Sequence, residues 1–184
     1  MSFALGTRMG FSLRALFGLA EPATPAAQTE SVRRIGAALE QMETSEARRL
    51  ACFAFVLARV AHADLSISDE ETRAMERIVR DFSGLPEAQA SLVVEIAKAQ
   101  NRLVGAIDNY LVTRQLRETS TLEERQGALH CVLAVAASDD AVSAVEDAEV
   151  RRIATELGFA HPEFIAARSV FRDKLEILRQ KPGG

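Results

Sequence analysis

A polar pattern that occurs twice constrains the fold more than any other feature of this sequence. The stretch "AHADLSISDEE" begins at Ala61 and the stretch "AASDDAVSAVE" begins at Ala136, 75 residues later. Each stretch contains an Asp, a Ser four residues later and a Glu three residues after that. A shift of 75 residues aligns seven identities in nineteen columns without a gap, namely Val60/Val135, Ala61/Ala136, Asp64/Asp139, Ser68/Ser143, Glu71/Glu146, Arg77/Arg152 and Ile78/Ile153. Average residue usage gives about one or two such matches by chance, so the chain looks like a duplicated helix–loop–helix unit.

Apolar residues recur at helical spacing through most of the chain. One such run contains Leu50, Phe53, Leu57 and Val60. Gly84 and Pro86 are typical of a helix end, and Pro162 suits the first turn of a last helix. No stretch shows the sustained alternation that a strand requires. The sequence therefore predicts an all-α fold with about eight helices.

The 184 residues can form one domain of ordinary size, which we place at residues 31–180 with a tail at 181–184. The stretch "EPATPAAQTE" at residues 21–30 is predicted to be a linker. Before it, residues 1–20 form an amphipathic segment that carries Arg8 and Arg14. This segment is either a terminal helix that packs on the domain or frays, or a short helix at a membrane surface. We favour the terminal helix, because only two positive charges flank the apolar face.

Charge and cysteine content narrow the possible partners and the compartment. The net charge of −4 argues against a nucleic-acid-binding protein, because such proteins need a basic surface. Cys52 and Cys131 lie in apolar helical runs without a nearby metal ligand, so we expect buried free thiols. Free thiols suit a reducing compartment, so we expect a cytoplasmic protein. In the membrane-surface alternative, residues 1–20 make a weak contact with the inner face of the membrane.

Part of the repeated polar pattern has a structural explanation. Ser68 with Glu71, and Ser143 with Glu146, have the spacing of capping boxes, in which the two side chains satisfy backbone N–H groups at a helix start. The stretch "TLEE", which begins at Thr121, predicts a third box outside the repeat. The two glutamates therefore need no further role.

The aspartates of the pattern are harder to explain by local structure alone. Asp64 and Asp139 each follow a predicted helix, whose carbonyl end disfavours an anion by ~0.3–1 kcal/mol. One explanation is that each Asp closes a turn by accepting local backbone N–H bonds. The other is a divalent cation, because carboxylates and helix-end carbonyls supply the oxygen ligands that Ca²⁺, Mg²⁺ or Mn²⁺ prefer. Asp140 adds a carboxylate to the second stretch.

These residues resemble the motif of the TerB family of tellurite-resistance proteins, written A-D-G-x-V/I-S-x-x-E. The resemblance extends over about residues 31–178, and the C-terminal half is similar to bacterial TerB-like proteins with two copies of the unit. It implies a compact helical domain with a role in tellurite or general stress resistance. It also implies that a divalent cation is coordinated by Asp64 and Glu71 in the first copy and by Asp139 and Glu146 in the second. Leu65 and Asp140 replace the motif's glycine.

An enzymatic function has little support in the sequence. His62, His130 and His161 are isolated from other metal-ligand residues, and each is expected to be structural. Neither a phosphate-binding glycine loop nor a nucleophile elbow nor an H-E-x-x-H motif is present. Two non-enzymatic hypotheses remain. One is a TerB-like module that binds or senses a divalent metal ion. The other is a helical adaptor that binds an unknown protein partner and no ion, with or without peripheral membrane contact through residues 1–20.

Overall fold

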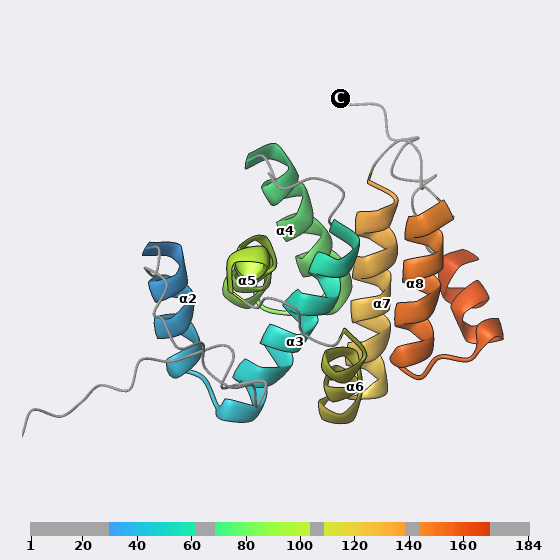
Figure 1. Cartoon of the computed structure of the whole chain (residues 1–184), viewed down its shortest axis with the longest axis horizontal. Helices are drawn as coiled ribbons and strands as arrows, with labels where there is room; N and C mark the ends of the chain where they lie inside the picture. The colour runs from blue at the N-terminus through green and yellow to red at the C-terminus, as the bar shows by residue number, and fades with distance from the viewer. Residues whose placement is uncertain (1–29, 62–68, 104–108, 139–143, 170–184) are drawn as a thin grey trace, which may run out of the picture.

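The computed structural model describes residues 30–61, 69–103, 109–138 and 144–169 (Figure 1). Within these ranges the regular structure is entirely helical, which confirms the all-α prediction. The labelled helices are α2 (Glu30–Glu40), α3 (Thr44–Ala61), α4 (Asp69–Ser83), α5 (Glu87–Leu103), α6 (Asn109–Thr119), α7 (Leu122–Ala136) and α8 (Ala144–Glu156). Residues 161–169 are also helical. None of these helices is long and apolar enough to cross a membrane.

The helix boundaries follow the duplication. Helix α3 ends at Ala61 and α7 ends at Ala136, while α4 begins at Asp69 and α8 begins at Ala144. Both pairs of boundaries are separated by the same 75 residues that align the two sequence copies. The two units therefore place a loop of the same length between helices that end and begin at equivalent positions. The loops themselves, with Ser68 and Ser143, lie outside the described residues, as do the N-terminal segment and all of the predicted linker except Glu30, which begins α2.

Helix α3 is the centre of the fold (Figure 1). Every residue from Leu50 to Ala58 is buried, because α3 contacts α5, α6, α7 and α8 on different sides. Helix α4 packs most extensively on α7, and α8 contacts both α7 and α3. The second helix of each unit thus packs against the first helix of the other unit. The two copies share one hydrophobic core, whose removal from water is the main force that stabilises the fold.

A glycine sets the close approach of α4 and α7. A Cβ atom at Gly127 would lie 2.8 Å from the backbone oxygen of Phe82 and 3.1 Å from Cα of Ser83. Both contacts are with backbone atoms, which cannot rotate away as a side chain can. Gly127 therefore lets the end of α4 lie directly on α7.

Local signals in the sequence are confirmed at two helix starts. The Thr121 hydroxyl accepts from Glu124 N–H at 3.2 Å, and the Glu124 carboxylate accepts from Thr121 N–H at 2.7 Å. The last helical segment begins with Pro162 in its first turn, and the carboxylate of Glu163 accepts from Ala160 N–H at 2.6 Å. The capping geometry needs only residues close in sequence, which is why the pattern predicts it.

The two cysteines are free and buried, as the sequence predicts. Burial raises the pKa of the Cys52 thiol to about 12, although the nearby Arg48 acts in the opposite direction. Burial also raises the pKa of Cys131. Both groups therefore remain neutral thiols near neutral pH and serve as small apolar side chains in the core.

We predict that Gly127→Ala destabilises the protein, although alanine favours helices by about 1 kcal/mol over glycine. The added methyl group must displace the backbone of α4, and overpacking of this kind typically costs about 1–3 kcal/mol beyond the propensity gain. Urea unfolding measures the difference. Gln126→Ala, at the exposed neighbouring position of α7, is the control and should change stability little. An equal effect of both substitutions would contradict the close approach.

Candidate functional site

Most of the predicted acidic ligands lie outside the described residues. Asp64, Asp139 and Asp140 lie outside the described residues, and the side chain of Glu146, in the first turn of α8, also lies outside them. Only the Glu71 side chain is described, and it is exposed in the first turn of α4. The structure thus gives the position of the helix ends around both loops and leaves the arrangement of the five acids a prediction.

The described chain contains no group of three or more His, Cys, Asp or Glu side chains that could hold a metal ion. Any cation at the predicted positions must therefore depend on the aspartates of the loops. The donor types fit such an ion, since carboxylates and the free carbonyls of a helix C-terminus are hard oxygen ligands.

The acidic residues just after the two loops differ in their ion pairs. After the second loop, Asp147 pairs with Arg151 at 3.0 Å and with Arg168 at 2.7 Å. At the start of α4, Asp69 and Glu70 form no ion pair with a described residue. Arginine thus offsets Asp147 after the second loop, whereas Asp69 and Glu70 pair with no described arginine or lysine. The expectation that Asp140 makes the second loop the better cation site stays a prediction.

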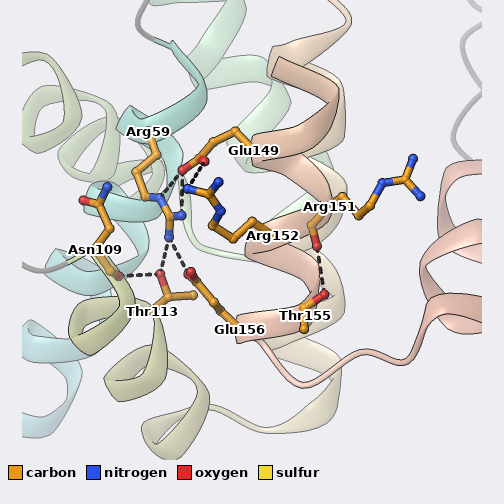
Figure 2. A network of polar contacts seen from close by, with 8 residues as sticks. All are labelled: Arg59, Asn109, Thr113, Glu149, Arg151, Arg152, Thr155 and Glu156. Carbon is orange, nitrogen blue, oxygen red and sulfur yellow. Dashed lines mark hydrogen bonds and ion pairs between the residues drawn. The ribbon is translucent and has the colours of Figure 1, made fainter. Parts of the chain in front are cut away.

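A buried arginine forms the main polar cluster of the fold (Figure 2). Arg59 lies near the end of α3, and only 3% of its side chain is exposed. Its Nε donates to Oε1 of Glu149 at 2.8 Å, and its Nη1 donates to Oε2 of Glu156 at 2.6 Å. Nη1 also donates to Oγ1 of Thr113 at 2.6 Å, and this hydroxyl donates to the backbone oxygen of Asn109 at 2.9 Å. One guanidinium therefore connects α3, α6 and α8.

The cluster balances its own charges. Burial of an unpaired guanidinium would cost several kcal/mol, so Arg59 needs the carboxylates that surround it. Glu149 and Glu156 supply two negative charges, and Arg152 supplies a second positive charge at 3.3 Å from Oε2 of Glu149. Nη2 of Arg59 lies 2.6 Å from Oε1 of Glu149 without an aligned hydrogen bond, so Coulomb attraction is its main interaction there.

The duplication does not repeat this cluster. The position equivalent to Arg59 is Ala134, and the position equivalent to Glu149 is Ala74. In that half Gly127 allows α4 and α7 to approach closely, whereas in the other half charged side chains lie between α3 and α8. Sequence inspection missed the cluster because arginine is usually exposed. The available signal was a lone arginine within "CFAFVLARVA", an otherwise apolar part of a helix.

The described histidines make aromatic contacts. The ring of His130 meets Phe82 edge-on, with centroids 6.3 Å apart. The ring of His161 lies 6.5 Å from that of Phe164. These contacts are consistent with the structural role that the sequence predicts, while His62 lies outside the described residues.

The family model described as tellurite resistance protein TerB matches residues 49–169, which is more than half of the chain. The matched range begins within α3 and includes both predicted loops and the Arg59 cluster. No curated protein and no solved structure matches the chain.

We predict that Arg59→Met lowers the free energy of unfolding by about 3–5 kcal/mol, because Glu156, whose side chain is 10% exposed, loses its described counter-charge and Glu149 keeps only Arg152. Chemical denaturation measures this loss. The control is Arg114→Gln, which breaks an exposed ion pair with Glu118 and should cost about 0.3–0.5 kcal/mol. Similar losses in the two variants would show that the cluster does not hold the helices together.

Proposed function

The chain belongs to the TerB family of tellurite resistance proteins, and on this premise we propose that it is a non-enzymatic module that binds divalent cations at two equivalent loops. The proposed ligands are Asp64 and Glu71 at the first loop, and Asp139, Asp140 and Glu146 at the second. The ion is Ca²⁺, Mg²⁺ or Mn²⁺, and the module acts in tellurite or general stress resistance in the cytoplasm.

The equivalence of the helix ends is the observation that carries this proposal. Asp64 and Asp139 are each the third residue after the end of a helix. Glu71 and Glu146 are each the third residue of the following helix. Capping accounts for the two glutamates, so the two aspartates, at equivalent positions in copies that differ elsewhere, are the residues that favour a shared ligand.

The chemistry of the helix ends supports a cation at these positions. The last carbonyl groups of α3 and α7 carry the negative end of the helix dipole. At α7, Leu133 O accepts from Ala137 N–H and Val135 O accepts from the N–H and the hydroxyl of Ser138, so a cation would use the remaining carbonyl oxygens or the second lone pairs. An aspartate placed there is repelled unless a positive charge lies between. A divalent cation would remove this repulsion and accept both kinds of oxygen as ligands.

A protein-interaction role is the second candidate. Tyr110 and Leu111, at the start of α6, are 52% and 55% exposed although both are large and apolar. Exposed apolar side chains side by side suit contact with a protein partner. In this alternative the acids cap helices and close turns, and no ion is bound.

We predict that millimolar Ca²⁺, Mg²⁺ or Mn²⁺ raises the melting temperature of the wild type and not that of Asp64→Asn/Asp139→Asn. An ion at about 100 times its dissociation constant stabilises the folded state by about 2.7 kcal/mol, which shifts the melting temperature by several degrees. Without metal, the double variant should be as stable as the wild type or more stable, since asparagine closes turns comparably.

The matched control is Asp81→Asn/Glu123→Gln, which removes two exposed carboxylates away from the loops and should keep the ion response. The single variants Asp64→Asn and Asp139→Asn then show which loop binds more tightly. An identical melting response of the wild type and the Asp64→Asn/Asp139→Asn variant would reject ion binding and leave the interaction role.

A further inference from the structure

A groove between α6 and α8 lies beside the Arg59 cluster. Its volume is about 510 Å³, within the range of roughly 300–1,000 Å³ that is typical of small-molecule sites. The residues that line it are Tyr110, Arg114, Arg117, Glu118, Thr155 and Glu156. Glu156 also pairs with Arg59 (Figure 2), and this ion pair fixes the position of one lining side chain on α8.

One of the two arginines that line the groove lacks a carboxylate partner among the described residues. Glu118 pairs with Arg114 at 2.8 Å, and Glu156 pairs with Arg59 at 2.6 Å. Both carboxylates that line the groove are therefore already neutralised. Arg117 forms no hydrogen bond or ion pair with a described residue, so its positive charge is available to a ligand.

A second arginine reinforces this charge. A Cβ atom at Gly158 would lie 2.9 Å from Nε of Arg117 and 3.2 Å from Nη1 of Arg125, so both guanidinium groups lie against this glycine. Gly158 adopts φ +91°, which further favours glycine at this position. Arg125 donates to the backbone oxygen of Leu157 at 2.8 Å, and its Nε is buried without a hydrogen-bond partner. Arg125 thus offsets the negative end of α8 and pairs with no described carboxylate.

Two neighbouring guanidinium groups without a carboxylate repel each other, and a bound anion would relieve this repulsion. We propose that the groove binds a small elongated molecule with an oxyanion, a carboxylate or phosphoryl group, on Arg117. Arginine suits either group because its N–H donors form a planar fork. Tyr110 lies two helical turns away, about 10 Å along α6, and its half-exposed ring packs against the apolar end of the ligand. This site is independent of the two acidic loops.

The test uses the full chain with inorganic phosphate, 2-naphthyl phosphate and 2-naphthoate, and measures dissociation constants by calorimetry. We expect 2-naphthyl phosphate or 2-naphthoate to bind more tightly than inorganic phosphate, and the better of the two identifies the anionic group. Arg117→Gln should weaken binding about tenfold, because a hydrogen bond to a charged group contributes roughly that factor or more. Tyr110→Ala should weaken binding of the naphthyl probes and leave that of phosphate unchanged.

The matched control is Arg77→Gln, which removes an exposed arginine on α4 that has no described partner. This variant loses the same charge and should bind the probes as the wild type does. Arg117→Lys keeps the positive charge and loses the planar guanidinium donors. Its dissociation constants for the probes should lie between those of the wild type and those of Arg117→Gln. The proposal is overturned if no probe binds the wild type, or if Arg77→Gln weakens binding as much as Arg117→Gln.

Discussion

The buried guanidinium of Arg59 is the interaction on which the arrangement of the C-terminal helices depends. Its three hydrogen-bond partners are 54, 90 and 97 residues away along the chain, and they lie on two further helices. Apolar packing is not directional, so it brings helices together without fixing their rotation. A guanidinium that must reach two carboxylates and a hydroxyl at once fixes how α3, α6 and α8 face one another.

The same interaction explains how a duplicated chain acquires two different halves. In one half Gly127 lets α4 and α7 lie in close contact, and Ala134 and Ala74 occupy the positions equivalent to Arg59 and Glu149. In the other half Arg59 and its carboxylate partners lie between α3 and α8, and α6 packs beside them. The two units keep equivalent helix ends around their loops, whereas the groove between α6 and α8 lies beside the Arg59 cluster, which is not repeated. The proposed cation sites thus lie at positions that the duplication repeats, and the proposed anion site lies beside the Arg59 cluster, which it does not repeat.

Features that depend on residues close in sequence could be predicted. The helices follow from apolar periodicity, the capping box at Thr121 from its spacing, and the boundary at Ala136 from its match with Ala61. The Arg59 cluster and the pair formed by Arg117 and Arg125 around Gly158 could not be predicted, because they depend on how the helices meet in space. The acidic loops could be predicted only in part. Their positions follow from the repeat, and coordination by Asp64 and Asp139 stays a prediction.

The most direct test of this account is a double-mutant cycle between Arg59 and Glu156, measured by the free energy of unfolding in urea. Arg59→Met and Glu156→Gln are compared singly and together. We expect a coupling energy of about 2–3 kcal/mol, since residues within one buried ion-pair network are strongly non-additive. The double variant should then be far more stable than the sum of the single losses suggests. Additivity within about 0.5 kcal/mol would contradict the claim that this ion pair fixes α3 to α8.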